Sequence, residues 1–187
     1  MPRPARYTVD VLLDAAAQLL AEQGPYAVTM SAVARSTGAP SGSVYHRFPT
    51  RAALCGELWM RTEERCQQEL MEALSQDGDA QQRCVAGALR LVQWCRDHPV
   101  EAQVLLADPN ELGSGDWPDT VVGRRKRLQR KLRKVLAELP DDSARVNAAI
   151  MDVPAAIVRR HLRARQSIPA GADVIVEDCA RALIAPS

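Results

Sequence analysis

The sequence predicts an all-α protein, and three features of its 187 residues support that prediction. Hydrophobic residues make up 47% of the chain and aromatic residues only 4%, so the core must be built mainly from Leu, Val and Ala, which favours packed helices. Apolar residues recur at helical spacing from the first segment to the last. No segment shows a strand-length alternation of polar and apolar residues that would compete with helices.

The first three helices are expected to be short and closely spaced. An apolar stripe over about residues 8–23 ends at a Gly-Pro pair, which predicts the first helix. Thr29 can cap a second helix through its hydroxyl, and Gly38 stands where the chain must reverse, a position that often needs a positive φ. A third helix is expected over about residues 41–48. The stretch 29–48 therefore reads as two helices joined by a glycine turn.

The rest of the chain is expected to form longer helices, for about nine helices in all. They cover about residues 51–75, 80–97, 99–107, 119–139, 142–165 and 172–185, with a Gly- and Pro-rich loop over 108–118. Pro154 falls inside the 142–165 pattern and should kink that helix, because proline lacks the N–H that an interior helical position donates.

The helix over 41–48 carries the residue types of a DNA-reading helix. Val44 and Phe48 form its apolar side, and the remaining residues are small, polar, aromatic or basic. Small residues at its start allow close approach to DNA, while Tyr45, His46 and Arg47 can donate hydrogen bonds to phosphates or base edges. This pattern fits the second helix of a DNA-binding helix-turn-helix.

Residues 8–60 resemble the TetR family of bacterial transcriptional regulators. The resemblance rests on a first helix ending in EQGPYAVTM, the core VARSTGAPSGSVYHRF and the following FPTRAAL. It implies an N-terminal three-helix DNA-binding domain over residues 1–50, followed by a helical bundle over 51–187 for ligand binding and dimerisation. Transferred by position, the residues expected to contact DNA are Thr29, Ser43, Tyr45, His46 and Arg51, to which residue chemistry adds Ser41, Gly42 and Arg47.

Two positions depart from the family pattern. Pro40 stands where a capping Ser or Thr is common, so Ser41 is left with two alternatives, capping its own helix or contacting DNA. Arg47 stands where an aromatic residue is common, and it can contact either guanine or a phosphate.

The resemblance also implies partners. It indicates a homodimer formed by the last two helices and bound to double-stranded operator DNA; the alternative is that these helices complete a monomer core. A small, largely apolar effector is expected to enter the helical body, with candidate wall residues Trp59, Met60, Trp94, Leu105, Leu106 and Trp117. The function favoured is a ligand-responsive transcriptional regulator, a repressor released by its effector; the alternative is a helical small-molecule carrier or sensor that does not act through DNA.

Other functional classes find little support in the sequence. The three histidines are widely separated, and no phosphate loop, HExxH or GxSxG motif is present, so we expect no enzyme, metal site or cofactor. No apolar run approaches the roughly 20 residues of a membrane span. Five cysteines without a CxxC pair suggest reduced thiols in the cytoplasm. The basic stretch from Arg124 to Lys134 lies on an amphipathic pattern, which favours a solvated or ion-paired helix face over a second nucleic-acid site or an anion at a pocket mouth.

Overall fold

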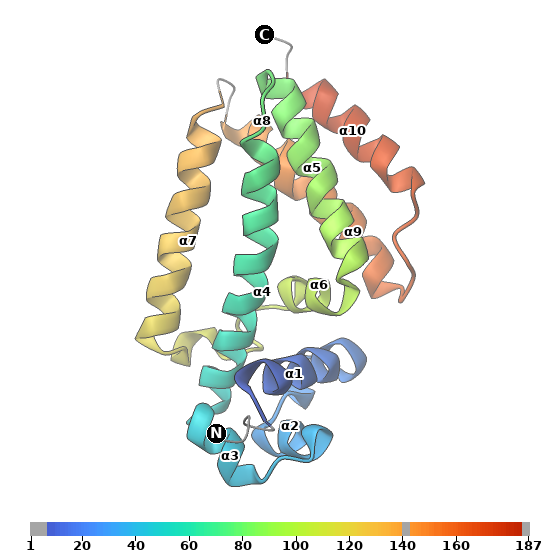
Figure 1. Ribbon diagram of the computed structural model, residues 1–187. Helices are drawn as coiled ribbons and strands as arrows, with labels where there is room; N and C mark the ends of the chain where they lie inside the picture. The colour runs from blue at the N-terminus through green and yellow to red at the C-terminus, as the bar shows by residue number, and fades with distance from the viewer. Residues whose placement is uncertain (1–6, 140–142, 185–187) are drawn as a thin grey trace, which may run out of the picture. The chain divides into compact units, whose positions relative to one another are not determined.

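The computed structural model describes residues 7–139 and 143–184, and over these residues it contains helices and no strand, which confirms the all-α prediction (Figure 1). The chain divides into two compact units. Unit 1 comprises residues up to 63 together with 100–125, and unit 2 comprises 64–99 and the residues from 126 onward. Two helices, α4 (Arg51–Leu74) and α7 (Asp119–Ala137), contribute residues to both units. The functional division predicted at residue 50 stays a prediction.

The N-terminal helices of unit 1 begin and end where the sequence signals lie. Helix α1 (Val9–Gln23) is capped by Thr8, whose hydroxyl accepts a hydrogen bond from the amide of Val11. A short 3₁₀ turn, η1 (Pro25–Ala27), leads to α2 (Met30–Thr37) and α3 (Ser41–Arg47). Helix α1 packs against α2, and α2 packs against α3 (Figure 1). The stripe predicted on α1 is buried and forms the core of this domain: Leu12, Leu13, Ala16, Ala17 and Leu20.

The remainder of unit 1 combines the start of α4 with a later stretch of chain. Thr50 caps α4, because its hydroxyl accepts a 3.0 Å hydrogen bond from the amide of Ala53. Helix α6 (Pro99–Leu106) is followed by the predicted loop, which contains the short 3₁₀ turn η2 (Ser114–Asp116). Leu112, within this loop, is fully buried. The loop is therefore anchored in the core of unit 1.

Unit 2 is built around α5 (Ala80–Asp97), which packs against α9 (Val153–Arg163) and α10 (Gly171–Leu183) (Figure 1). Asp79 and Gln82 form a capping box at the start of α5. Gly87 permits close approach to α4: a Cβ at this position would lie 2.7 Å from Cδ2 of Leu74. A side chain larger than hydrogen at residue 87 would therefore force the buried side chain of Leu74, or the helices themselves, to shift.

The expected helix over 142–165 is interrupted in a different way from the simple kink predicted at Pro154. Its first residue lies outside the described ranges; beyond it the chain forms α8 (Ser143–Asn147), a π-helical turn (Ala148–Asp152) and then α9. The amide of Val153 bonds to the carbonyl of Ala148, five residues earlier. In an α-helix the ring of Pro154 would clash with the carbonyl four residues before it. The wider π-turn comes just before the proline and accommodates it.

None of the described helices combines the length and apolar character needed to cross a lipid bilayer.

Candidate nucleic-acid interface

The turn between α2 and α3 is fixed by local hydrogen bonds. Thr29 caps α2 as predicted, since its hydroxyl accepts a 3.1 Å bond from the amide of Ala32. Gly38 follows α2 with φ = +67°, in the left-handed region that favours glycine. The next amide, of Ala39, bonds back to the carbonyl of Ala34 at 3.0 Å. The carbonyl of Gly38 also accepts a 2.8 Å bond from the hydroxyl of Tyr7, which links the turn to the start of the chain.

Helix α3 has one buried side and one exposed side. Val44 is fully buried and Phe48, just after the helix, is 3% exposed, so both pack into the core as predicted. The side chain of Tyr45 is exposed, and the exposed residues around it are Ser41, Gly42, His46 and Arg47, with Ser43 half-buried. Hydroxyl, imidazole, phenol and guanidinium groups thus share one accessible surface, which can donate hydrogen bonds to phosphates and to base edges.

Ser41 does not cap α3. Pro40 occupies the N-cap position, no side chain caps this helix, and Ser41 is its first residue. The carbonyl of Pro40 accepts a 2.8 Å bond from the amide of Ser43, which closes the first turn. Of the two alternatives for Ser41, the structure excludes the cap and leaves its exposed hydroxyl accessible.

Arg51 occupies a different position from the other predicted contact residues. Its side chain is partly buried, and Nε donates a 2.8 Å hydrogen bond to the carbonyl of Val28. Nη2 donates to two further carbonyls, those of Pro25 at 2.7 Å and Glu111 at 3.1 Å. The guanidinium therefore ties the entry to α2 to the start of α4 and to the loop after α6, all within unit 1.

Two tyrosines in this domain have positions that the sequence did not indicate. Tyr7 precedes α1 and holds Gly38, thirty-one residues away, a contact that no local pattern signals. Tyr26 lies in η1 and is 71% exposed, the highest exposure among the large hydrophobic residues described. An aromatic residue beside a Gly-Pro pair is an ordinary turn feature, so its exposure could not be read from the sequence.

The structure brings two of the six predicted effector-wall residues together. Trp59 and Trp117 are both 6% exposed, and their ring centroids lie 5.9 Å apart with an interplanar angle of 44°. Gly56 leaves room for the ring of Trp117 against α4, because a Cβ there would lie 3.2 Å from Cγ of Trp117. Met60 is fully buried in the same unit, while Leu105 and Leu106 are half-buried. Trp94 belongs to unit 2 and is 1% exposed. Its ring contacts that of His98 in a tilted arrangement, with ring centroids 5.2 Å apart.

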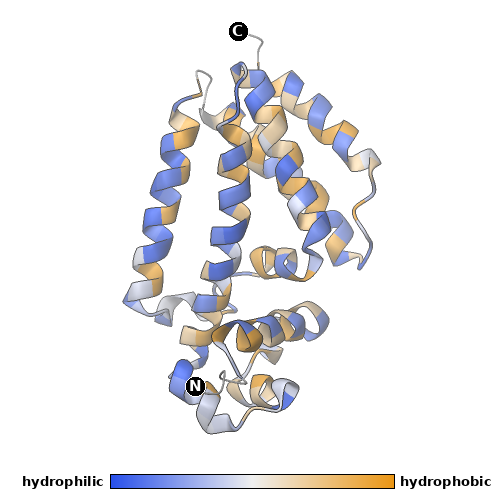
Figure 2. Cartoon of the chain, viewed as in Figure 1, coloured by the Kyte–Doolittle hydropathy of each residue, from blue (hydrophilic) through white to orange (hydrophobic). Residues whose placement is uncertain are grey.

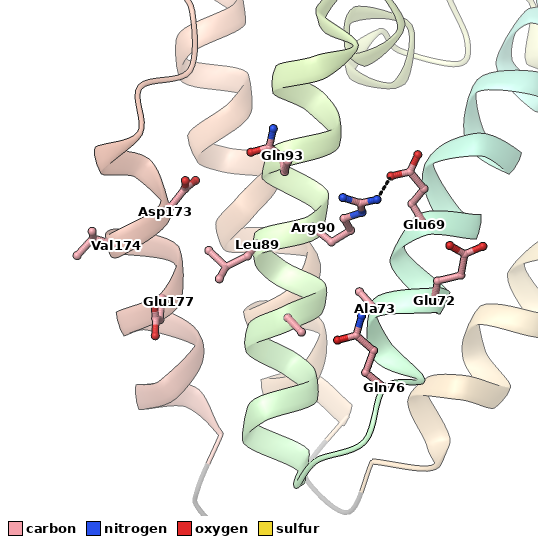
Figure 3. A pocket seen from close by; sticks show the side chains of 11 residues that line it. Glu69, Glu72, Ala73, Gln76, Leu89, Arg90, Gln93, Asp173, Val174 and Glu177 are labelled. Atoms are coloured by element: carbon pink, nitrogen blue, oxygen red, sulfur yellow. Dashed lines mark ion pairs between the residues drawn. The ribbon is translucent and has the colours of Figure 1, made fainter.

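A pocket of about 530 Å³ lies within unit 2, between residues of α4, α5 and α10 (Figure 3). Most of its wall residues are charged or polar, and Arg90 forms a 2.9 Å ion pair with Glu69 across it. Asp173 and Glu177 line the α10 side and are paired with Arg96 and Arg181. None of the six predicted effector-wall residues lines this pocket. Because its carboxylates have partners and its wall is polar, it is a poor fit for a largely apolar ligand.

The basic stretch on α7 is ion-paired at its start and exposed beyond it, and Figure 2 shows the helix to be largely hydrophilic. Arg124 lies 2.6 Å from Glu57, and Arg125 lies 3.3 Å from Glu63. These pairs match the expectation of an ion-paired helix face, and both acidic partners belong to α4. The later cations lie on the more accessible part of the helix, where the exposed residues include Lys126, Arg127, Lys131, Arg133 and Lys134.

The five cysteines lie within the described residues as reduced thiols, and four of them are buried. Burial raises the pKa of the Cys95 thiol to about 12. Burial also raises the pKa of Cys55, with the nearby charge of Arg51 opposing part of that effect. Within the described residues, no group of His, Cys, Asp and Glu is arranged to hold a metal ion. The buried thiols are structural core residues rather than reactive groups.

Solved structures with a similar fold cover nearly the whole chain. A transcriptional regulator from Rhodococcus sp. Rha1 is 17% identical, with a TM-score of 0.75 over 96% of this chain and 100% of that chain. A TetR family regulator from Marinobacter aquaeolei VT8 is 12% identical, with a TM-score of 0.73 over 96% of each chain. The transcriptional regulator FadR from Bacillus subtilis, solved in complex with stearoyl-CoA, is 13% identical, with a TM-score of 0.71 over 95% of this chain and 98% of that chain.

Sequence comparison assigns the N-terminal domain. A search of curated proteins found no match. Residues 12–58 match the family described as bacterial regulatory proteins, tetR family, and this range contains the turn at Gly38 and all of α3. The N-terminal domain therefore matches the bacterial regulatory proteins of the tetR family, and the fold of the whole chain is similar to that of solved TetR family transcription regulators.

Proposed function

We propose that the chain is a repressor that binds operator DNA through α2 and α3 and leaves it when a small molecule binds the helical body. The observation that supports this most directly is the division of α3. Val44 is buried in the core, while Tyr45, His46 and Arg47 are exposed together on one helix of seven residues. The proposed DNA contacts are these three residues with Thr29, Ser41, Gly42 and Ser43. Arg51 is proposed instead to hold the domain together, because its donors bind carbonyls.

The proposed functional unit is a homodimer formed through α9 and α10. Two large apolar side chains of α10, Val174 and Ile175, are 61% and 55% exposed in the single chain. Burying them against a second copy would remove apolar area from water. A two-fold arrangement also presents two copies of α3 to successive turns of the operator, so the same residues contact DNA twice.

The proposed effector acts by differential affinity. It must bind the DNA-released conformation more tightly than the DNA-bound one, by a coupling free energy of roughly 1–3 kcal/mol. The FadR structure solved with stearoyl-CoA indicates that this fold can hold a small molecule, and we propose a largely apolar one here. As a regulator with reduced thiols, the protein would act in the cytoplasm.

A gel-shift titration tests the proposal. Purified protein is titrated against labelled DNA from the promoter region of its own gene, with unrelated competitor DNA and at a salt concentration that weakens nonspecific binding. We expect one retarded complex that unrelated DNA does not remove and that Tyr45→Ala weakens at unchanged helical content. Equal affinity for promoter and unrelated DNA would overturn the proposal. If the protein then still bound small molecules, the carrier function would take its place.

A further inference from the structure

We propose that unit 1 contains a binding site for an organic cation, formed by Trp59, Trp117 and Glu63 and filled in this structure by the chain's own Arg125. The site combines two aromatic faces with one carboxylate, all from α4 and the segment that leads into α7. The inference concerns ligand binding alone and does not depend on operator binding.

The geometry is that of a cation held by aromatic rings and a negative charge. The guanidinium carbon of Arg125 lies 5.4 Å from the ring centroid of Trp59 and 5.8 Å from that of Trp117. Nε of Arg125 lies 3.3 Å from Oε2 of Glu63. Both rings are within the roughly 6 Å at which a cation is attracted by an aromatic face, and the attraction strengthens when the cation is desolvated.

The walls of this site are fixed independently of Arg125. The indole N–H of Trp59 donates a 2.9 Å hydrogen bond to Oε2 of Glu63, which holds ring and carboxylate together. The indole N–H of Trp117 donates a 3.1 Å hydrogen bond to the carbonyl of Leu112, itself fully buried. Each tryptophan uses its N–H for the fold and keeps its π face for the cation. Removing the arginine side chain should therefore leave the two rings and the carboxylate in place.

Arg125 is held less firmly than the walls. Its side chain is 31% exposed, whereas that of Glu63 is 11% exposed. Its Nε is buried without a hydrogen-bond partner among the described residues, even though the carboxylate is near. By contrast, the adjacent Arg124 forms a 2.6 Å hydrogen-bonded ion pair with Glu57. Arg125 thus lacks the hydrogen bond that holds Arg124, and a cation that needs no such bond can displace it toward solvent.

The hydrogen-bond acceptors that the site offers determine which class of cation it can hold. A guanidinium carries five N–H donors that need acceptors, and this site supplies Nε with none. A quaternary ammonium group carries a full charge and no N–H, so aromatic faces and one carboxylate satisfy it completely. The structure therefore assigns the site to a ligand with a quaternary or similarly alkylated ammonium centre.

The test uses choline as the probe and 3,3-dimethylbutan-1-ol, its uncharged isostere, as the control, with binding to the full-length protein followed by tryptophan fluorescence and calorimetry. We expect choline to bind Arg125→Gln at least about tenfold more tightly than wild type, because the internal competitor is gone. Arg124→Gln removes the same charge from the adjacent residue and should give no such gain. Adding Glu63→Gln to Arg125→Gln should abolish the gain while keeping an acceptor for Trp59.

Three outcomes would overturn the inference. They are choline binding Arg125→Gln no better than wild type, the neutral alcohol binding as well as choline, or Arg124→Gln producing an equal gain. Circular dichroism establishes that each variant is folded. If Arg125→Gln does not fold, Arg125→Lys serves in its place, because a shorter, more strongly hydrated cation competes less well for the two rings; choline affinity for it that does not exceed wild type would count against the site.

Discussion

Nη2 of Arg51 donates a 2.7 Å hydrogen bond to the carbonyl of Pro25, twenty-six residues earlier in the chain. The same guanidinium binds the carbonyls of Val28 and Glu111, so one side chain links three segments of unit 1. Charged hydrogen bonds of this kind contribute more than neutral ones, and their carbonyls lose their donors when the arginine is removed.

Arg51→Ala should therefore lower the free energy of unfolding by about 2 kcal/mol. The cause is the loss of charged hydrogen bonds to partly buried carbonyls. Urea denaturation followed by circular dichroism measures the change. Arg47→Ala is the matched control, because this exposed arginine on α3 should leave stability within about 0.5 kcal/mol. Equal stability of the two variants would contradict the role assigned to Arg51.

Two glycines in the helix-turn-helix should respond to alanine with opposite signs. Gly38 has φ = +67° and open space where a Cβ would lie, so Gly38→Ala should destabilise by about 1 kcal/mol through backbone strain alone. Gly42 lies in α3, also with open space, so Gly42→Ala should be neutral or stabilise by roughly 0.5–1 kcal/mol. Thermal unfolding of both variants gives the comparison. If both substitutions destabilised the protein, backbone strain at Gly38 would not explain the loss of stability in Gly38→Ala.

Removing a phosphate-binding cation should change the salt dependence of DNA binding. If Arg47 contacts a phosphate, Arg47→Ala should reduce the slope of log K against log salt by about 1, because one fewer counterion is released. Fluorescence anisotropy with promoter DNA at several salt concentrations measures the slope. Lys131→Ala removes an exposed cation of α7 and should leave the slope unchanged. A change of the same size in both variants would place the electrostatic contact elsewhere.

The proposed dimer should depend on the exposed apolar residues of α10. Val174→Asp combined with Ile175→Asp places two charges where the partner would pack, so the protein should sediment as a monomer at micromolar concentration. Sedimentation velocity gives the mass. Val11→Asp is the control, since Val11 on α1 is 41% exposed and lies outside the proposed interface. Dimers that persist in the double variant would exclude α10 as the contact.

Alkaline pH should destabilise the fold through Cys95. Burial raises the pKa of this thiol to about 12, above its ordinary value of 9.0. The unfolded chain thus releases this proton first, and the folded state keeps it. The stability due to the buried thiol is fully present below pH 9 and is lost between pH 9 and 12, by up to about 1.4 kcal/mol per pH unit. Denaturation at several pH values should show a shallower decline in Cys95→Ala; identical slopes would contradict the shift.

The local signals of the sequence proved informative at helix ends. Thr29 and Gly38 mark where α2 begins and ends, because a cap acts within three or four residues of itself. The exposed set on α3 was also predictable, since helical spacing separates Val44 from Tyr45.

Contacts between distant segments could not be predicted in the same way. Trp59 and Trp117 were each expected to line a ligand site, but no spacing indicated that they would meet or that Arg125 would lie over both. The family resemblance places Arg51 among the DNA contacts, and its hydrogen bonds to the carbonyls of remote residues have no sequence signature. The π-turn before Pro154 likewise depends on how the chain relieves a steric clash, and a bend was the simpler expectation.

The π-turn before Pro154 determines which way the side chains of α9 point. Each residue of an α-helix advances the side-chain direction by about 100°, and the turn at Ala148–Asp152 includes one residue more than a regular turn would. Deleting a single residue there would rotate α9 about its axis, carrying the buried Val158 and Leu162 away from the core and turning exposed arginines of α9 toward it. The extra residue therefore acts as an angular spacer that keeps α8 and α9 correctly oriented on the same core.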